Sequence, residues 1–416
     1  MTEREFDLVL YGATGFAGKL TAQYLADAGT TARIALAGRS EDRLRAVREG
    51  LGPAAAQWPL VVADASAPST LDAMAARTRV VVTTVGPYTR YGVALVAACA
   101  AAGTDYADLT GETMFIRDSI DLHHKQAVDT GARIVHSCGF DSVPSDLTVY
   151  ALYRRAAADG AGDLGDTNFV LRSFAGGVSG GTAASMLEVL QTASENPQAR
   201  AAMTDPYTLS PDRGAEPEFG AQSDVRWRRG GEIAPELAGY WTGAFAMAAP
   251  NTRIVRRSNA LLDYAYGRRF EYAEQMSLGR SVAAPVAAAA VTGVNALVLN
   301  LGGRFFNRLP RGLVERLLPA PGTGPDERTR AQGHYRVETY TTTSSGARYV
   351  ATMAQQGDPG YQATAVLLGE CGLALALDRD KLSDLHGVLT PAAAMGEALL
   401  HRLPAAGVTL DAAKLD

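Results

Sequence analysis

The order of apolar and polar positions divides this chain into two parts that differ in kind. Over residues 1–146, short apolar runs alternate with amphipathic stretches of helical period, and the connections between them are short. The predicted strands lie at residues 6–11, 33–37, 60–63, 80–84 and 133–136. Such alternation predicts an α/β fold with a Rossmann-type, doubly wound parallel sheet and helices on both faces.

After residue 146 the alternation gives way to a second pattern. A predicted helix is followed by strands near residues 168–174, 269–276, 335–343 and 348–356. The turn Ser344-Ser345-Gly346 joins the last two as a hairpin. We therefore expect an α+β domain at 147–359 that binds substrate or dimerises, in a protein that forms homo-oligomers. Helical patterns return near the end, and we expect residues 360–416 to pack back on the first domain.

One apolar stretch, residues 282–301, is almost uncharged and long enough to span a bilayer. It is rich in alanine and contains Asn295 and Asn300, which are costly in hydrocarbon. A buried helix, a wall of the substrate pocket or a helix lying on a membrane surface is therefore favoured over a transmembrane span.

Composition narrows the class of protein. The 416 residues suit two domains, and 47% hydrophobic residues supply an ample core. A net charge of −5 gives no overall positive field for nucleic acid. The three cysteines are far apart, which predicts neither a disulfide framework nor a cysteine-built metal site. The first residues show no secretory signal, so we expect a cytoplasmic protein that is either free or held at a membrane surface.

A glycine-rich turn follows the first predicted strand and opens a helix. It reads Gly12-Ala13-Thr14-Gly15-Phe16-Ala17-Gly18. The first glycine allows the tight turn, the second lets the backbone approach a pyrophosphate, and the third permits close packing of helix on strand. The phosphate then lies at a helix N-terminus, among N–H groups without partners. This context predicts a dinucleotide site.

The end of the second strand indicates which dinucleotide binds. An NAD site places an acid there to hold the ribose 2′-hydroxyl, whereas this chain has Arg39 and Ser40. A guanidinium and a hydroxyl suit a 2′-phosphate, so the sequence predicts NADP(H). The alternative is that Arg39 is a solvated residue at a helix start, since Glu41 and Asp42 follow at once.

Further strand ends complete the predicted cofactor site. Asp64 and Ala65 are placed to meet the adenine edge, although Asp64 serves almost as well as a helix N-cap. The remaining predicted contacts, toward the ribose and nicotinamide, are Thr84, Val85, Gly86, Pro87, Cys138 and Gly139.

Several motifs together resemble those of the saccharopine dehydrogenase-like oxidoreductases. Beside the glycine turn they are Gly38-Arg39-Ser40, Gly86-Pro87-Tyr88 with Gly92, Tyr106-Ala107-Asp108-Leu109-Thr110-Gly111-Glu112, Gly139-Phe140-Asp141-Ser142-Val143-Pro144-Ser145-Asp146, Ser179-Gly180-Gly181-Thr182, Pro319-Ala320-Pro321-Gly322 and Gly387-Val388-Leu389-Thr390-Pro391. The pattern is most similar to the mycobacterial-type trans-acting enoyl reductases. The resemblance implies NADPH-dependent reduction of an α,β-unsaturated acyl thioester, carried on the acyl carrier domain of a separate polyketide synthase during lipid biosynthesis.

That chemistry needs a donor to the developing enolate and a proton source. The candidates are Tyr88, Asp141 and Ser142, with a plain helix cap as the alternative for Asp141. His136 is more typical of a packed strand end than of an acid or base. Glu112 is a candidate for positioning substrate or bridging the domains. No Tyr-x-x-x-Lys pair of the short-chain reductase kind is expected here, and water is an alternative proton source.

Two rival functions stay open at this point. One is C–N oxidoreduction of the saccharopine type, which needs convergent cations for several carboxylates. The arginines available for it are Arg226, Arg228, Arg229, Arg253, Arg256 and Arg257. The other is a non-catalytic NADPH-binding protein attached to a membrane through residues 282–301. That apolar stretch and the arginines that follow it suit a greasy chain, a membrane or an anionic carrier domain better than a small amino acid.

Overall fold

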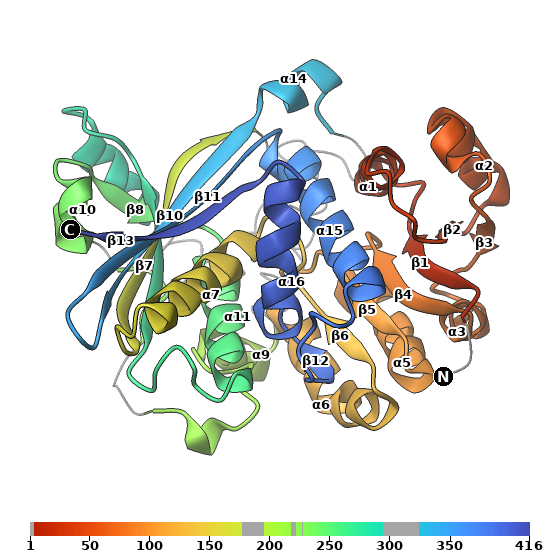
Figure 1. Ribbon diagram of the computed structural model, residues 1–416, viewed down its shortest axis with the longest axis horizontal. Coiled ribbons are helices and arrows are strands. Elements are labelled where there is room, and N and C mark those ends of the chain that lie inside the picture. Colours follow the sequence, from red (N-terminus) through yellow and green to blue (C-terminus); the bar gives the residue numbers. More distant parts are fainter. Residues whose placement is uncertain (1–3, 177–194, 218–221, 227, 294–323) are drawn as a thin grey trace.

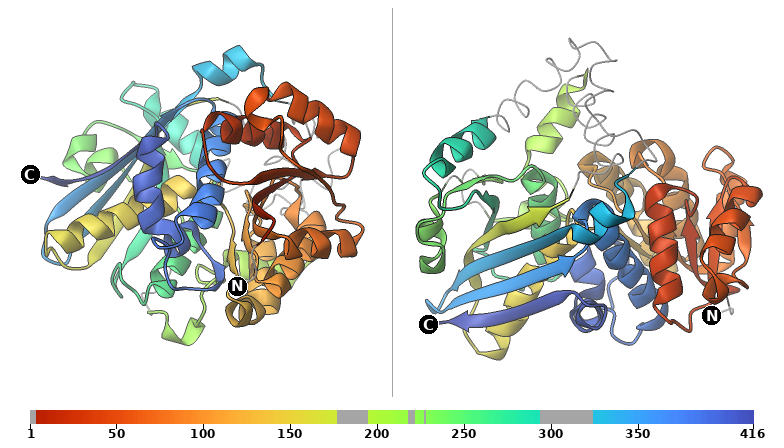
Figure 2. Two further views of the ribbon diagram at one scale, coloured as in Figure 1. Left: turned by 45° about the vertical axis from the view of Figure 1, so that its right-hand side comes forward. Right: turned by 90° about the horizontal axis from the view of Figure 1, so that it is seen from above.

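Two sheets lie side by side, with two long helices from the end of the chain between them (Figure 1). The computed structural model describes residues 4–176, 195–217, 222–226, 228–293 and 324–416. A turned view of the same ribbon places these two helices, α15 (Thr364–Leu377) and α16 (Pro391–Ala405), between the two sheets again (Figure 2). The fold class predicted from the sequence is confirmed.

The first sheet has seven parallel strands in the order β12-β6-β5-β4-β1-β2-β3. Their bounds are β1 Phe6–Tyr11, β2 Ile34–Gly38, β3 Leu60–Val62, β4 Thr78–Thr83, β5 Asp105–Ala107, β6 Arg133–Val135 and β12 Gly387–Leu389. The strand order reverses at the β1/β4 pair. In open α/β sheets, ligands bind beyond the carboxyl ends of the strands at such a reversal.

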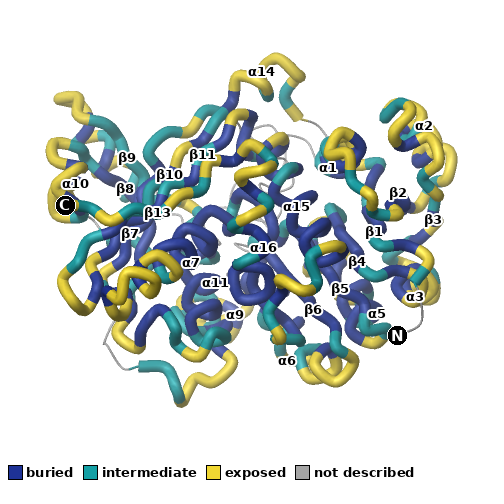
Figure 3. The backbone as a smooth tube through the Cα atoms, in the orientation of Figure 1, coloured by how far each residue is buried: buried dark blue, intermediate teal, exposed yellow. Residues whose placement is uncertain are grey.

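Helices cover both faces of this sheet. They are α1 Phe16–Asp27, α2 Glu41–Gly50, α3 Pro68–Ala76, α4 Tyr88–Tyr91, α5 Val93–Ala102 and α6 Thr113–Thr130. Along β1, Leu8 and Leu10 pack into one core, whereas Val9 and Tyr11 pack into the other. Burial on both faces explains why the strand reads as a continuous apolar run. In Figure 3 the inner strands of this sheet and α15 are mostly dark blue, whereas α2 at the edge is largely yellow.

The second sheet is mixed, with the order β13-β11-β10-β7-β9-β8. Its strands are β7 Leu164–Ala175, β8 Thr242–Ala244, β9 Glu271–Ser277, β10 His334–Thr343, β11 Arg348–Gln356 and β13 Thr409–Leu415. The helices α7 (Val143–Ala158) and α11 (Ala248–Leu261) pack against it. Short helices lie in the connections: α9 Pro197–Thr204, α10 Gly230–Ile233 and α14 Glu327–Gln332. The predicted hairpin joins β10 and β11 through Gly346, whose φ is +83°.

The end of the chain contributes to both sheets. Helix α15 packs on α1, β1 and β4, and β12 adds a seventh strand beside β6. The last strand, β13, instead pairs antiparallel with β11 of the second sheet. The expectation that all of 360–416 lies on the first domain is therefore wrong for the final strand. Backbone pairing with the open edge of β11 places it there.

Among the described residues, one helical stretch, Pro359–Leu377, has the length and hydropathy of a membrane span. Most of it is buried between the two sheets, as in the core helix of a folded domain (Figure 3).

A buried polar network joins helix α7 to helix α11 and to strand β9 of the second sheet. Asn251 donates to Glu274 Oε2 over 3.0 Å and to Ser145 Oγ over 3.1 Å. Tyr272 donates to the other oxygen of Glu274 over 2.8 Å. Burial raises the pKa of Glu274 to about 8, against which these hydrogen bonds act only in part.

The neighbouring Asp146 ties α7 to the end of the chain. Its carboxyl accepts from Ser258 Oγ over 2.5 Å and from the N–H of Ala392 over 2.8 Å. Burial raises the pKa of Asp146 to about 7. The first turn of α16 is thereby held on α7.

These raised pKa values predict that stability falls as pH rises. Glu274 and Asp146 hold protons in the fold that they lose on unfolding, so their contribution is full below about pH 4 and is lost through about pH 7 and 8. We expect the free energy of unfolding, measured with urea, to decline between pH 5.5 and 8.5, and Glu274→Gln to weaken that decline.

Glu271→Gln provides the matched control on the same strand, because Glu271 is partly exposed and paired with Arg226. It should keep the wild-type pH dependence. An unchanged pH dependence in Glu274→Gln would show that Glu274 does not titrate in this range.

Candidate functional site

The glycine turn lies at the carboxyl end of β1, where the strand order reverses. Gly12 has a φ of +89°, and a Cβ there would lie 2.6 Å from Val85 Cγ2. A Cβ on Gly18 would lie 2.1 Å from the carbonyl oxygen of Gly12. Both positions therefore require glycine.

Gly15 is the N-cap of α1 and carries no side chain to satisfy the first turn. The amides of Phe16 and Ala17 thus stay available at the positive end of a 12-residue helix, which suits a pyrophosphate. Ala13 is fully buried beneath the turn, and Thr14 is partly exposed above it. The arrangement is the one that the motif predicts.

Arg39 and Ser40 lie where β2 meets α2. Ser40 is the N-cap of α2, and its hydroxyl accepts from the N–H of Arg43 over 3.4 Å. Arg39 is exposed at the strand tip. No acidic side chain occupies the end of β2 itself, so the position that holds a ribose hydroxyl in an NAD site is taken by a cation.

A groove of about 580 Å³ lies between α1 and α2. It contributes two cations to the candidate cofactor site that were not predicted from the sequence. Its lining residues are Thr14, Lys19, Gln23, Arg43, Ala46, Val47, Gly50 and Leu51. Lys19 and Arg43 are exposed, and neither has an ion pair within the described part of the chain. Arg43 follows Ser40 by three residues, so the first turn of α2 directs it to the same side. The three-residue spacing between Ser40 and Arg43 could have identified Arg43 from the sequence as a further candidate for the cofactor site.

Asp64 lies beyond β3, near Arg39. Its Oδ1 accepts from the N–H of Ser66 over 2.9 Å and from Ser66 Oγ over 2.8 Å. These bonds, together with Arg39, hold the pKa of Asp64 below its usual range. Asp64 closes the turn that includes Ala65, while the N-cap of α3 is Ala67. The N-cap alternative for Asp64 is thus wrong, and its closeness to Arg39 fits the adenine edge.

The loop after β4 lies against the glycine turn. Thr84 Oγ1 donates to the carbonyl of Gly12 over 3.3 Å, and the Thr84 N–H donates to Tyr11 over 3.1 Å. Val85, Gly86 and Pro87 follow with partial or full exposure. These residues border the crevice at the β1/β4 reversal.

Tyr88 is placed differently from the prediction. Its hydroxyl donates to the carbonyl of Thr83 over 3.3 Å and accepts from the N–H of Leu109 over 3.2 Å. The side chain is 5% exposed, and burial raises the pKa of the phenol well above its usual range. Both bonds are internal, so the phenol ties β4 to the loop after β5. The geometry contradicts its assignment as a proton or hydrogen-bond donor to substrate.

Two buried acids organise these loops. Glu112 accepts from the N–H groups of Tyr88 and Thr89 over 2.9 and 2.8 Å, so it caps the short helix α4. Asp108 accepts from His136 Nδ1 over 2.7 Å and from the N–H of Ser137 over 3.0 Å. Ser137 has a φ of +64°, a strained conformation for a residue with a side chain.

His136 is fully buried and packs edge-on against Phe115. Its Nε2 has no hydrogen-bond partner among the described residues. This matches the interpretation of a packed strand-end histidine. The Asp108–His136 pair holds together the ends of β5 and β6, and Glu112 fixes the neighbouring loop.

The remaining residues predicted to bind the cofactor or to act in catalysis lie in the connection from β6 to α7. Cys138 and Gly139 are buried, and a Cβ on Gly139 would lie 2.8 Å from Leu109 Cδ2. Ser142 is the N-cap of α7, and its hydroxyl donates inward to Asn251 Oδ1 over 3.0 Å. Ser142 therefore positions α7 against α11 rather than presenting a hydroxyl to substrate.

Asp141 is the one acid of that connection with some solvent exposure. Burial by the surrounding protein raises the pKa of its carboxyl to about 6. The helix cap is Ser142, so the alternative of a plain N-cap for Asp141 is wrong. A carboxyl with a pKa of about 6, beyond the carboxyl end of β6, is protonated more readily than an ordinary aspartate and is suited to donate a proton at mildly acidic pH.

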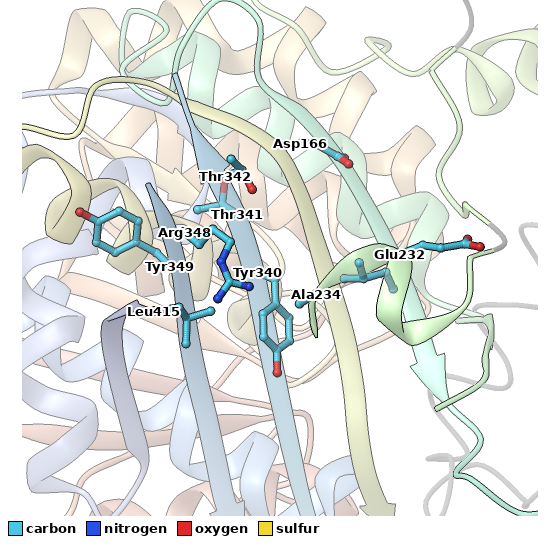
Figure 4. A pocket seen from close by; sticks show the side chains of 10 residues that line it. Asp166, Glu232, Ala234, Tyr340, Thr341, Thr342, Arg348, Tyr349 and Leu415 are labelled. Carbon is cyan, nitrogen blue, oxygen red and sulfur yellow. The ribbon is translucent and has the colours of Figure 1, made fainter. Parts of the chain in front are cut away.

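A pocket of about 130 Å³ lies elsewhere, on the second sheet (Figure 4). Figure 4 shows Tyr340 and Arg348 from β10 and β11 beside Ala234. Among its charged groups, Asp166 pairs with Arg226 and Arg228, and Arg348 pairs with Glu236, while Glu232 accepts from the N–H of Arg229. It lies far from the strand ends of the first sheet in the fold and offers no convergent chemistry.

Most of the arginines considered for a carboxylate-rich substrate form ion pairs or hydrogen bonds with other groups of the protein. Arg253 and Arg256 both pair with Asp224, at 2.5 and 3.3 Å. Arg226 pairs with Asp166 and Glu271, and the buried Arg257 donates to two backbone carbonyls. These cations do not converge on one open site.

Some predicted features lie outside the described residues. They are the motifs at 179–182 and 319–322 and the second half of the apolar stretch 282–301. Within the part of the chain that is described, no group of three or more His, Cys, Asp or Glu side chains is arranged to hold a metal ion.

Comparison with known proteins agrees with this geometry. The family model of the saccharopine dehydrogenase NADP binding domain matches residues 8–135, which confirms NADP(H) as the cofactor class. Over its full length, with 98% of this chain and 99% of the other covered, the fold is similar to that of apo saccharopine dehydrogenase (L-Glu forming) from Saccharomyces cerevisiae. The TM-score is 0.53 at 14% identity, a likeness of fold alone.

Closer relatives come from mycobacteria. A trans-acting enoyl reductase of Mycobacterium bovis BCG is 67% identical over 99% of both chains, and one from Mycobacterium ulcerans is 65% identical over 99% of both. A Mycobacterium tuberculosis H37Rv protein, named provisionally for the same activity, is 71% identical over 100% of this chain and 99% of its own. At this identity over essentially the whole length, the resemblance of the motifs is confirmed, and the chain belongs to the trans-acting enoyl reductases, NADP-dependent oxidoreductases of the saccharopine dehydrogenase family.

Proposed function

We propose that this protein uses NADPH to reduce the α,β double bond of an acyl thioester that a separate polyketide synthase presents on its acyl carrier domain. Relatives at 65–71% identity over the full length carry the name of that activity. Within the structure, the observation that supports it most is Asp141, a partly exposed acid of raised pKa in the connection after β6.

The residues present fit the dinucleotide. The crowded Gly12 and Gly18 leave the backbone at the N-terminus of α1 open for the pyrophosphate. Arg39, with Lys19 and Arg43 from the groove between α1 and α2, would hold the 2′-phosphate. Asp64 and Ala65 would border the adenine, and the loop 84–87 with Cys138 and Gly139 would border the ribose and nicotinamide.

NADPH, when bound, supplies a hydride to Cβ of the substrate. The electron pair of the double bond then moves toward the thioester oxygen, and a proton must be added at Cα to complete the reduction. Asp141 would deliver that proton, because a pKa raised to about 6 lets its carboxyl carry one more often than an ordinary aspartate does. The roles of Tyr88, Glu112 and Asp108 are to position loops, since their polar atoms bond within the protein.

The C–N alternative receives less support. A substrate of the saccharopine type carries several carboxylates and needs several open cations together. Of the six arginines considered for it, Arg229 lies over Trp241, and the other five are bonded to Asp166, Asp224, Glu271 or backbone carbonyls. An uncharged acyl chain makes no such demand.

A direct assay tests the proposed function. Purified protein is incubated with NADPH and enoyl thioesters of increasing chain length, and oxidation is followed at the absorbance of the reduced nicotinamide. We expect turnover with enoyl thioesters and none with amino acids plus aldehydes or keto acids. Turnover only in the second set would establish C–N chemistry. Tight NADPH binding with no turnover in either set would contradict an enzymatic role.

If Arg39, Lys19 and Arg43 hold the 2′-phosphate, removing one of these cations should weaken the binding of NADPH selectively. Because each charge-assisted bond contributes roughly 1.5–3 kcal/mol, we expect Arg39→Ala to weaken NADPH about 10- to 100-fold and leave NADH nearly unchanged. Arg43→Ala should act in the same direction. Calorimetric titration with both nucleotides measures this.

Arg45→Ala is the matched control, because Arg45 lies on the same helix and pairs with Glu41 and Asp42. It should bind NADPH as the wild type does. Equal losses of NADPH and NADH in Arg39→Ala would contradict recognition of the 2′-phosphate by that residue.

The raised pKa of Asp141 predicts a pH profile. The donor is active when protonated, so turnover should fall as pH rises through about 6. Asp141→Asn should lower kcat by about 10²- to 10⁴-fold and leave the Kd for NADPH within about twofold.

Tyr88→Phe gives the contrast. Its hydroxyl serves two backbone groups, so this variant should keep most of its turnover and the same pH profile. If Asp141→Asn reduces the substrate at the wild-type rate, the proton comes from elsewhere, with water as the nearest source.

A further inference from the structure

The apolar helix Ala284–Gly293 has two unlike faces. Its inner face is seated on β8: Ala284 and Ala288 are fully buried. Thr292 Oγ1 accepts from the N–H of Ala244 over 3.2 Å. A Cβ on Gly243 would lie 3.5 Å from the carbonyl of Ala288, so the strand and the helix are in close contact. The helix is therefore fixed in orientation.

Its outer face is exposed and apolar. Val282, just before the helix, is 97% exposed, and Val286, one turn on, is 72% exposed. These are the two most exposed large apolar side chains among the described residues. Ala289, Ala290 and Gly293 are exposed as well, and no charged residue occurs from 281 to 293. Two largely exposed valines, one on a fixed helix and one just before it, point to a surface that something apolar covers.

Cations and aromatic rings lie at the base of this helix. The Arg280 guanidinium lies over the Tyr240 ring at 4.1 Å, and that of Arg229 lies over the Trp241 ring at 5.0 Å. Tyr240 and Trp241 lead directly into β8. Neither Arg280 nor Arg229 forms an ion pair with the carboxylates of the described chain, whereas Arg172, which also lies over Tyr240, pairs with Glu338. Two positive charges at this rim are thus not neutralised.

We propose that this surface, made of Val282, Val286, Arg280 and Arg229, docks on an anionic lipid bilayer. A charge-free apolar helix face flanked by arginine, tyrosine and tryptophan is typical of helices that lie in a membrane interface. The free guanidiniums complement anionic headgroups. Val282 and Val286 enter the boundary of the acyl chains, while the two arginines stay at headgroup level.

A protein partner fits this surface less well. A stable protein interface buries roughly 800 Å² on each side. Two valines beside alanines and a glycine present far less apolar area than that. Reversible attachment to a bilayer needs only a small buried area together with electrostatic attraction. Figure 2 shows the helix that precedes residue 294 at the edge of the described part of the chain.

Vesicle flotation of the full-length protein tests the proposal. The probes are phosphatidylcholine vesicles with and without 30% phosphatidylglycerol. We expect flotation with the anionic vesicles that weakens as salt is raised. Val286→Asp should lower the partition coefficient at least tenfold, and Arg280→Ala should lower it about fivefold, the effect of one cation near an anionic surface.

Leu122→Asp is the matched control, because Leu122 is 66% exposed on α6, away from this surface. It should float as the wild type does. Unchanged thermal unfolding and NADPH affinity in all three variants show that the fold is intact.

Three results would overturn the proposal. The first is that the wild type does not float with either vesicle. The second is equal flotation of wild type and Val286→Asp. The third is a dimer in solution, without vesicle binding, that Val286→Asp dissociates, because a second copy would then cover the face.

Discussion

The close approach of α1 to β1 is the constraint on which the rest of this structure depends. The space between Gly18 and the carbonyl of Gly12 admits no Cβ, so the helix can begin directly above the strand end. The loop with Thr84 and Val85 packs on the same turn, and α15 packs on α1. A side chain at either glycine would displace the helix from the sheet. The amides that face the crevice would move with it.

The distribution of charge separates structural arginines from those available to ligands. In a chain with 39 basic residues, composition alone cannot make that distinction. Arg253 and Arg256 both pair with the carboxylate of Asp224. Arg257 donates hydrogen bonds to the backbone carbonyls of Leu209 and Val388. Cations without such partners gather at the groove between α1 and α2 and beside the exposed helix on β8. Both locations can attract negative groups.

The sequence predicted what local geometry determines and missed what distant contacts determine. The glycine turn, the first-sheet strands of clear apolar period and the hairpin at Gly346 depend on neighbours in the chain, and the structure has them. The short strands β5 and β12 include Asp105 and Gly387, so no continuous apolar run marked them in the sequence. Tyr88 looked like a donor because its partners, Thr83 and Leu109, are set by folding. Likewise, only the packing of α1 against α2 places Lys19 in the same groove as Arg43.

The pairing of β12 with β6 has a consequence for synthesis of the chain. The ribosome completes residues 1–146 long before Gly387–Leu389 emerge, and until then β6 is the outer strand of an unfinished sheet. An exposed strand edge is a template for wrong pairing. The nascent first domain therefore keeps a vulnerable border while about 240 further residues (147–386) are made, until Gly387–Leu389 pair with β6.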